Sequence, residues 1–347
     1  MKLDKGRDLA GAGEILEGWL RDRLDLVQAH VSDLSLPDRA GLSNETILFT
    51  AELDDGAHTT TEELVVRISP ALENQLCRDT LFESQARLLQ VLHEQRLRVP
   101  NVRWFEADPR WFDRAFFVMD RAHGRVPISE PIYNAEGWLY DATPEQRRTA
   151  WESAMTELVG INRVSPDLLR FLPGGTAGFT EVLDGIRAEY RWACDGNEHP
   201  IVDRLWKWLE SNVPTAPPTG LSWGDARVGN MMFDDEFQLV VVMDWELVSL
   251  GTPIMDLGWW LFFDDVHSEV YPRLDGLGDR RETIERWEQG TGLSADGVEW
   301  YEILAAVRLT TLVIRALNLQ GIQGSDWIPF TRLAYDRLGW SEPPAVC

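Results

Sequence analysis

The sequence predicts an α+β protein of two lobes, a small mixed N-lobe at residues 1–122 and a mainly helical C-lobe at residues 123–347. The length of 347 residues exceeds the usual size of one compact domain, which favours two lobes around a cleft. Strand-like apolar runs gather before residue 125, whereas helical spacing of apolar residues dominates after it. Hydrophobic residues make up 44% of the chain and charged residues 26%, which is typical of a folded globular protein.

In the N-lobe, the apolar residues change between helical spacing and strand-like runs. The polar loop DDGAHTT separates two of the strand-like runs and predicts a hairpin. Asp79 precedes the second helical run and is a candidate N-cap. The predicted elements are, in order, a helix at 8–29, strands at 39–53 and 63–70, a helix at 79–95, and strands at 99–108 and 115–124.

The C-lobe shows mostly helical spacing, interrupted by two short strand-like runs at 231–233 and 238–243. The Pro-rich segment 212–220 is predicted to be a connector that leads into these strands. Helices are predicted at 145–163, 180–193, 199–212, 279–290, 296–318 and 328–338.

The net charge of −24 and a pI near 4.6 disfavour binding to nucleic acid or to a membrane surface, because both carry phosphate and attract clustered Lys and Arg. No apolar stretch approaches the ~20 residues needed to cross a bilayer. The first 20 residues lack the apolar core of a signal peptide, and the three cysteines form no CxxC pair, so we expect a cytoplasmic protein. The sequence indicates no particular oligomeric state.

The chemistry is concentrated between residues 223 and 246. Asp225 follows Leu-Ser-Trp in a short polar loop, Asn230 comes five positions later, and Asp244 directly follows the apolar run 240–243. Magnesium prefers oxygen ligands and is usually held by one or two carboxylates together with substrate phosphates, which Asn230 and Asp244 fit. A carboxylate that orients and deprotonates an attacking hydroxyl is the other requirement of phosphoryl transfer, and Asp225 fits it. The order of Asp, Asn and Asp matches the general kinase pattern.

WGDARVGN, DWE and LGTPIMDL resemble the HGDxxxxN, D-x-x and GxPxxDL motifs of aminoglycoside phosphotransferases and choline-kinase-like enzymes. Upstream, GLSNET at 41–46 is similar to the phosphate-covering loop of that family, and ELVVRISP to its nucleotide-binding strand. The resemblance covers about residues 38–260. It implies a two-lobed protein-kinase-like fold, with ATP between the lobes, and transfer of the γ-phosphate of ATP, with Mg²⁺, to a hydroxyl of a small molecule.

The resemblance also implies roles for residues of the C-lobe. Asp225 would be the catalytic base, with Asn230 and Asp244 as metal ligands. Arg227, within the same loop, is a further candidate catalytic residue on its own chemistry: it either contacts substrate or phosphate or holds the loop through Glu246 or Asp256. Asp256 would brace the catalytic loop through hydrogen bonds.

In the N-lobe, the implied roles concern the nucleotide. Arg67 stands where relatives often carry a phosphate-binding Lys, and its helix-borne partner would be Glu83 or Gln85. The segment from Phe117 to Asp120 would be the hinge that faces adenine. The residues implied to bind the nucleotide are Gly41, Ser43, Asn44, Arg67, Met119 and Asp120.

This chain departs from the pattern of the resistance enzymes at two positions, and other segments resemble a different branch of the family. Trp223 replaces the usual His, and we expect its ring to fill the space without reproducing the hydrogen bonds of that His. Arg67 replaces Lys, so a planar fork replaces a point charge. Arg227, DWELVSLG and PIMDLGWW look closest to the branch of phosphotransferase domains associated with acyl-CoA dehydrogenases.

Two alternative functions and three acceptors remain to be compared. A nucleotide-binding pseudokinase or regulatory module without turnover would keep the fold. A protein kinase is disfavoured because only eleven residues separate Asp244 from Asp256, too few for a long activation segment. The acceptor would be an amino sugar, an amino alcohol or a hydroxyacyl compound, bound by C-lobe helices and the insert at 126–141.

The 16 tryptophans, including the pair Trp259-Trp260, are interpreted as core residues and none is assigned to substrate.

Overall fold

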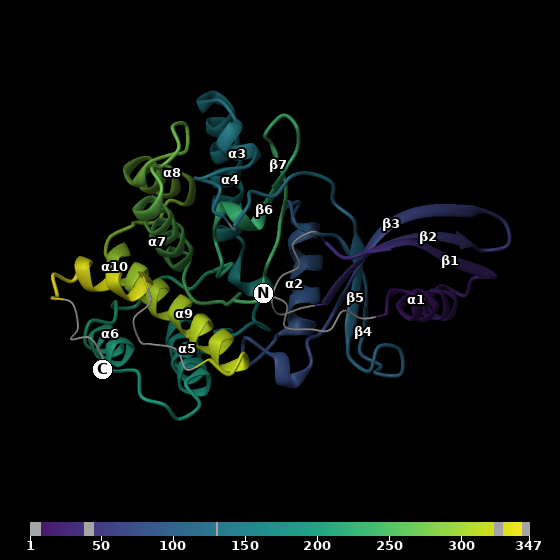
Figure 1. Ribbon diagram of the computed structural model, residues 1–347, viewed down its shortest axis with the longest axis horizontal. Coiled ribbons are helices and arrows are strands. Elements are labelled where there is room, and N and C mark those ends of the chain that lie inside the picture. The colour runs from purple at the N-terminus through teal and green to yellow at the C-terminus, as the bar shows by residue number, and fades with distance from the viewer. Residues whose placement is uncertain (1–7, 38–44, 130, 323–328, 342–347) are drawn as a thin grey trace. The chain divides into compact units, whose positions relative to one another are not determined.

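The computed structural model describes residues 8–37, 45–129, 131–322 and 329–341. The chain divides into two compact units. The first comprises the residues up to Glu94 together with Val99–Ala122, and the second comprises Gln95–Arg98 together with all residues from His123 onward. The first unit contains a five-stranded sheet and the second is mainly helical (Figure 1).

The sheet of the first unit is antiparallel throughout, in the order β1-β2-β3-β5-β4. The hairpin and the two later strands predicted from the sequence are confirmed. The strands are β1 (Gln28–Ser35), β2 (Glu45–Asp54), β3 (Thr59–Ile68), β4 (Val102–Glu106) and β5 (Phe116–Asp120).

The prediction of a helix over 8–29 is wrong at its C-terminal end. Helix α1 (Leu9–Leu24) stops where Asp25 adopts a left-handed conformation with φ 53°, and β1 begins three residues later. Residues 28–31 alternate between exposed and buried, a strand period that the apolar spacing of the preceding helix obscured. No Gly or Pro separates the two elements, so the sequence carries no breaker at this boundary.

Two helices cover opposite faces of this sheet. Trp19 of α1 packs edge-on against Phe116, with ring centroids 5.0 Å apart, on one face. Phe82 of α2 (Phe82–Glu94) packs against Phe117, which points to the other face because neighbouring strand residues alternate. On the α1 face, the strands bury Ile47, Phe49, Ala51, Leu53, Leu64, Val66, Ile68 and Val118.

Helix α2 begins three residues later than predicted. The Asp79 carboxylate accepts a hydrogen bond from the Leu81 backbone N–H, and Leu81 itself has a φ of 48°. Asp79 therefore stabilises the turn before the helix and is not its N-cap. A 3₁₀ turn, Leu72–Asn74, lies between β3 and this turn.

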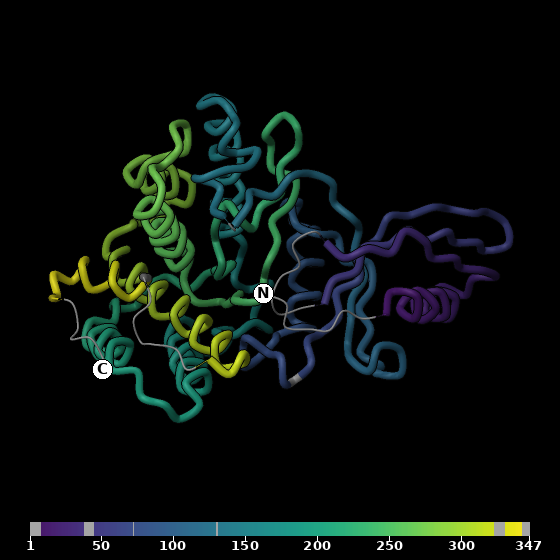
Figure 2. The backbone as a smooth tube through the Cα atoms, viewed as in Figure 1, coloured from purple at the N-terminus to yellow at the C-terminus, as the bar shows by residue number. Residues whose placement is uncertain are grey.

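The second unit is built around α9 (Val298–Leu319), which contacts α5, α6, α7 and α10. Figure 2 traces the backbone through these helices and the loops that join them. The six predicted helices are confirmed to within about two residues. The helices are α3 (Trp138–Asp141), α4 (Pro144–Asn162), α5 (Phe179–Ala193), α6 (Pro200–Ser211), α7 (Ile254–Val270), α8 (Arg280–Thr291), α9 and α10 (Pro329–Arg337), with 3₁₀ turns at Pro166–Leu168 and Val228–Asn230.

Helix α7 is missing from the sequence prediction, which was an error. All nine residues from Ile254 to Phe262 are buried, so this half of the helix is buried on every side and lacks the helical period of an amphipathic segment. The predicted strands β6 (Met231–Phe233) and β7 (Leu239–Val242) are confirmed as an antiparallel hairpin that pairs Met231 with Val242.

Within the described ranges, none of the helices has both the length and the apolar character needed to span a membrane.

Candidate functional site

The candidate catalytic loop runs from residue 222 to residue 230 and lies wholly within the second unit. It enters through a bridge between Ser222 and Ser249 and leaves through a 3₁₀ turn into β6. Gly224 has a φ of 97°, and a Cβ at this position would lie 2.2 Å from the Leu247 carbonyl oxygen. Only glycine fits this close approach, which explains the Gly before Asp225.

Asp256, in the first turn of α7, fixes this loop as the resemblance implies. Its side chain is fully buried, and its two oxygens accept four hydrogen bonds. Burial raises the pKa of Asp256, whereas these four donors favour the ionised form. The donors are the backbone N–H groups of Gly224 (2.9 Å) and Trp223 (2.8 Å), the Ser222 hydroxyl (2.8 Å) and the Asn162 amide (2.7 Å).

Trp223 makes hydrogen bonds that the sequence analysis did not expect. Its indole Nε1–H donates to the carbonyl oxygens of Met243, at 3.0 Å, and Asp244, at 2.8 Å. The ring fills the space, as expected, and its indole adds hydrogen bonds of its own. A side chain of the catalytic loop holds the main chain that carries Asp244, in addition to packing against the Trp245 ring.

The Asp225 carboxylate is held by three side chains. Trp259 Nε1 donates to Oδ1 at 2.8 Å and Arg227 Nε donates to the same oxygen at 3.1 Å. Asn230 Nδ2 donates to Oδ2 at 2.6 Å and to the Asp225 carbonyl oxygen at 3.1 Å. The side chain of Asp225 retains 16% of its exposure, so it stays reachable from solvent.

Trp259 is the residue of this site that sequence reasoning missed. Trp259 is a buried residue of α7, which agrees with the prediction that the tryptophans are core residues. Its one polar atom nevertheless faces Asp225. The sequence could have indicated this role, because Trp259 comes three residues after Asp256. On a helix, residues at i and i+3 share a face, so both would face the catalytic loop. The missing helix prediction concealed that relation.

Asn230 and Asp244 lie at adjacent positions of the hairpin. The Met243 N–H donates to the Asn230 carbonyl oxygen at 2.9 Å, and Asp244 follows with a φ of 61°. A carboxylate and a carbonyl can only accept hydrogen bonds, so the Asn230 amide nitrogen must face Asp225. Its Oδ1 is then left for another partner. An amide oxygen and a carboxylate are hard oxygen donors that suit Mg²⁺.

Three or more His, Cys, Asp or Glu side chains do not gather as a metal site anywhere in the described part of the chain.

Arg227 contacts Asp225, a partner that was not among those considered from the sequence. Its Nη1 lies 3.4 Å from the Ser129 hydroxyl, and its guanidinium lies over the Phe263 ring, 5.4 Å from the centroid. One turn further along α7, His267 Nδ1 lies 3.2 Å from the Tyr133 hydroxyl. The insert at 126–141 and one face of α7 thus meet beside Asp225.

Burial keeps the side chains of His267 and Tyr133, where α7 meets the insert, uncharged. Burial, with the Arg227 charge as a second cause, lowers the pKa of His267 to about 4. Burial raises the pKa of the Tyr133 phenol. Among Arg227, His267 and Tyr133, Arg227 is therefore the charged side chain at neutral pH.

The predicted nucleotide-binding residues of the first unit occupy both faces of its sheet. Arg67 is paired with Phe117 and Met119 with Val65, so Arg67 and Met119 share the face covered by α2. Asp120 points to the other face, where its carboxylate accepts hydrogen bonds from Asn101 at 2.7 Å and Arg103 at 2.6 Å.

Of the two candidate partners for Arg67 on α2, Gln85 is buried and donates to the Thr80 carbonyl oxygen at 2.6 Å, whereas Glu83 is exposed. Gly41, Ser43 and Asn44 lie outside the described residues.

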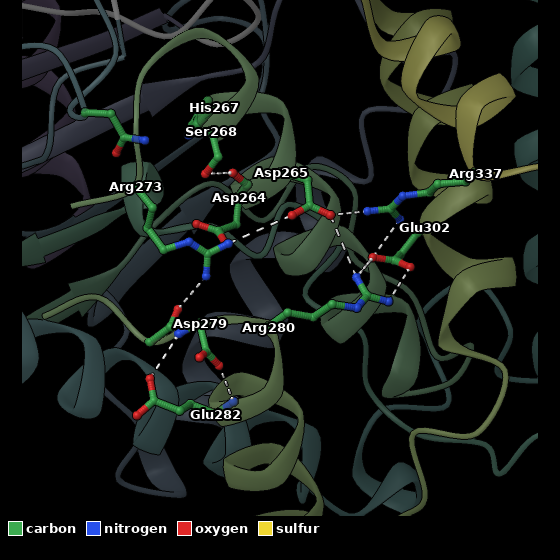
Figure 3. A network of polar contacts seen from close by, with 12 residues as sticks. Asp264, Asp265, His267, Ser268, Arg273, Asp279, Arg280, Glu282, Glu302 and Arg337 are labelled. Carbon is green, nitrogen blue, oxygen red and sulfur yellow. Dashed lines mark hydrogen bonds and ion pairs between the residues drawn. The ribbon is translucent and has the colours of Figure 1, made fainter. Parts of the chain in front are cut away.

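A network of charged side chains joins the C-terminal half of α7 to α8, α9 and α10 (Figure 3). Asp264 pairs with Arg273, and Asp265 pairs with Arg337. Glu302 of α9, which is fully buried, accepts from Arg280 at 2.9 Å and pairs with Arg337 at 2.6 Å. Burial raises the pKa of Asp264 to about 7 despite its Arg273 partner.

The catalytic loop, its buried Asp brace and the two-unit α+β architecture define a kinase-like phosphotransferase. The model of the phosphotransferase enzyme family matches residues 36–289, more than half of the chain, and the chain belongs to this family.

Curated relatives carry acyl-CoA dehydrogenase names, in agreement with the branch indicated by the sequence. The chain is 25% identical over 267 residues to the probable acyl-CoA dehydrogenase IBR3 of Arabidopsis thaliana, which covers 73% of this chain and 30% of that protein. It is 22% identical over 217 residues to human acyl-CoA dehydrogenase family member 11, covering 60% of this chain and 27% of that protein. The chain therefore spans less than a third of the length of these relatives.

Solved structures share the fold at low identity. A putative aminoglycoside phosphotransferase from Ralstonia eutropha aligns with a TM-score of 0.65 and 21% identity, covering 92% of this chain and 93% of that chain. Macrolide 2'-phosphotransferase type I aligns with a TM-score of 0.57 and 18% identity, covering 98% and 100%. A mutant of aminoglycoside phosphotransferase APH(4)-Ia, in complex with ADP and hygromycin B, aligns with a TM-score of 0.51 and 14% identity, covering 93% and 96%.

Proposed function

We propose that this protein is an ATP- and magnesium-dependent phosphotransferase that moves the γ-phosphate of ATP to a hydroxyl of a small molecule. The observation that carries the proposal is the Asp225 carboxylate, held by three donors and linked through Asn230 to the β-hairpin that leads to Asp244. Membership of the phosphotransferase family supports the reaction class. A structure of a family member with ADP supports the use of a nucleotide.

Asp225 acts as the catalytic base in this proposal. Its carboxylate accepts the hydrogen bond of the acceptor hydroxyl and takes up the proton as the hydroxyl oxygen bonds to the γ-phosphorus. The bond from that phosphorus to the bridging oxygen of ADP breaks, so the products are a phosphate monoester and ADP. The protein mainly positions the reacting groups and offsets their charge, as in other phosphoryl transfers.

Asn230 and Asp244 are proposed to hold Mg²⁺, which would offset the negative charge of the phosphates when bound. Their roles in this chain are linked through the main chain and Asp225. Because Asn230 contacts both Asp225 and the backbone before Asp244, a displacement of the hairpin would disturb the base and the metal ligands together.

The nucleotide contacts of the first unit are proposed for Gly41, Ser43, Asn44, Arg67, Met119 and Asp120. Arg67 would bind phosphate through its guanidinium, which can form two parallel hydrogen bonds to phosphate oxygens. The Asp120 carboxylate is already occupied by Asn101 and Arg103, and its backbone N–H donates to the Asn101 carbonyl oxygen at 3.0 Å. Its contact with adenine would therefore come from its backbone carbonyl oxygen.

Among the three acceptor classes, the surroundings of Asp225 favour a hydroxyacyl compound. Arg227 places a cation beside the base, and His267 and Tyr133 are neutral at physiological pH. An ammonium group next to the reacting hydroxyl of an amino sugar or amino alcohol would be repelled by Arg227. A carbonyl or carboxylate there would accept hydrogen bonds from it. The acyl-CoA dehydrogenase names of the curated relatives point to the same class of compound.

The test uses ATP labelled at its γ-phosphate and a panel with matched members of the three acceptor classes, each bearing a free hydroxyl. Asp225→Asn should lower the rate of phosphate transfer by about 10²–10⁴-fold with nucleotide binding retained. Asp235→Asn, at an exposed carboxylate in the turn between β6 and β7, is the matched control and should leave the rate unchanged.

Nucleotide binding without transfer to any acceptor would instead identify a pseudokinase. Transfer to amino sugars in preference to hydroxyacyl compounds would contradict the choice of acceptor and leave the reaction class intact.

A further inference from the structure

Trp259 provides a hydrogen bond to Asp225 from outside the loop motif WGDARVGN. Its indole nitrogen lies 2.8 Å from Asp225 Oδ1, although 34 residues separate the two in sequence. Only 3% of Trp259 is exposed, so the donor side of this bond is shielded from water. Hydrogen bonds from a fixed donor to a carboxylate are stronger and more directional than those between neutral groups.

The donors around Asp225 leave one oxygen less occupied than the other. A carboxylate has about four lone-pair positions, two on each oxygen. Oδ1 already receives Trp259 and Arg227, whereas Oδ2 receives Asn230 alone. The next hydrogen bond, that of an acceptor hydroxyl, is therefore directed to Oδ2.

Helix α7 carries Trp259 on a support that is fixed at both ends. Asp256, one turn before Trp259, accepts from the backbone N–H groups of Trp223 and Gly224 in the catalytic loop. Beyond Trp259, Asp264 and Asp265 pair with arginines from other elements of the second unit (Figure 3). The helix is therefore held in place relative to the loop, and the indole donor with it.

We propose that Trp259 is a positioning residue for the base: it locks Asp225 through Oδ1 and reserves Oδ2 for the acceptor hydroxyl. This role rests on the proposed function, in which Asp225 is the base. The χ2 torsion of Asp has a broad, nearly two-fold distribution, so an unheld carboxylate rotates easily about it. The indole hydrogen bond prevents this rotation. Arg227 alone is a weaker lock, since its guanidinium is partly exposed and its bond is longer.

The hydrogen bond is tested first by NMR, without turnover. In protein labelled with ¹⁵N-tryptophan, the indole resonance of Trp259 is assigned by its loss in Trp259→Phe. In Asp225→Ala this resonance should move upfield, because its carboxylate acceptor is gone. The resonance of Trp300, whose indole donates to the Leu209 carbonyl oxygen, should stay in place. An unmoved Trp259 resonance would overturn the proposal.

The positioning role is tested by two substitutions that separate the N–H from the bulk. Trp259→Phe keeps an aromatic ring and removes the donor, whereas Trp259→His is smaller and places its Nε2 at the ring position of the indole nitrogen. We expect Trp259→Phe to lower kcat about ten- to a hundredfold with the KM for ATP unchanged. Trp259→His should recover most of that loss.

If only packing mattered, Trp259→His would lower kcat more than Trp259→Phe does. Trp259 borders a cavity of about 10 Å³, and the smaller His would enlarge this cavity more than Phe. Trp260→Phe, on the same helix and equally buried, is the matched control and should retain kcat. Equal kcat in Trp259→Phe and the wild type, or a poorer Trp259→His, would overturn the role. A wild type without turnover contradicts the proposed function instead, and the NMR result then decides the Trp259–Asp225 contact by itself.

Discussion

The two ends of α7 bury carboxylates in different ways. At the N-terminal end, the fully buried Asp256 is surrounded by four neutral donors, two of them backbone N–H groups of the catalytic loop. At the C-terminal end, Asp264 and Asp265 pair with guanidinium groups. Glu302 of α9 is fully buried and shares one of those guanidiniums, that of Arg337.

The difference follows from what each end must hold. Backbone donors fix the course of a loop because their positions depend on its dihedral angles, and a displaced loop loses them all. Arginine pairs hold helices together through long side chains that tolerate small shifts. Asp256 therefore sets the geometry of the site, and the arginine network sets the stability of the helix that carries it.

The largest effect is expected from Asp256→Asn. An amide offers one acceptor oxygen, so about two of the four donors would face an NH₂ group, and each unsatisfied donor costs about 1–3 kcal/mol. We expect a loss of about 3 kcal/mol in the free energy of unfolding, measured in urea, and a fall in kcat of about 10²-fold. Glu269→Gln, at an exposed position on the same helix, should change neither quantity.

Glu302→Gln should affect stability and spare the chemistry. Arg280 and Arg337 would lose their shared carboxylate, and Arg280 is about one third exposed, so water relieves part of the cost. We expect a loss of about 2 kcal/mol in the free energy of unfolding. The kcat of the folded protein should stay within about twofold of the wild type. A parallel fall in kcat would show that the network also shapes the catalytic loop.

Asp264→Asn should remove a pH dependence of stability. The pKa of Asp264 rises from 3.8 to about 7 on folding because of burial, so the folded state binds a proton more tightly than the unfolded state. The stability that Asp264 contributes is thus full below about pH 4 and is lost as the pH rises through 7. Between pH 5 and pH 8, the free energy of unfolding should fall more in the wild type than in the variant. An unchanged difference would mean that Asp264 stays ionised beside Arg273.

His267→Gln should produce a smaller effect of opposite sign. The pKa of His267 falls from 6.5 to about 4 on folding, so the unfolded state binds the proton more tightly. The stability contributed by neutral His267 is present above pH 6.5 and is lost as the pH falls towards 4. The variant should lose less stability than the wild type between pH 7 and pH 4.5. Equal losses would contradict a buried, neutral His267.

Local patterns were sufficient for several parts of this molecule. The β2–β3 and β6–β7 hairpins were predicted because alternating apolar residues flank short polar turns. The loop Asp and Asn and the bracing Asp256 were recognised from their order and spacing. By contrast, β1 was missed, with its first two residues assigned to the preceding helix, because no breaker separates the two elements. Helix α7 was missed because its first half is buried on all sides.

The family, the α+β architecture and the motif residues Asp225, Asn230, Asp244 and Asp256 could be predicted from the sequence, because all of these depend on spacing within short segments. The side chains that surround Asp225 could not, because they come from segments that meet only in the folded protein. Trp259 reaches it from a helix 34 residues away, and Trp223 reaches the carbonyl of Asp244 across 21 residues. Such contacts depend on how α7 and the β6–β7 hairpin pack around the loop, and the direction of a buried N–H is fixed only when that packing is complete.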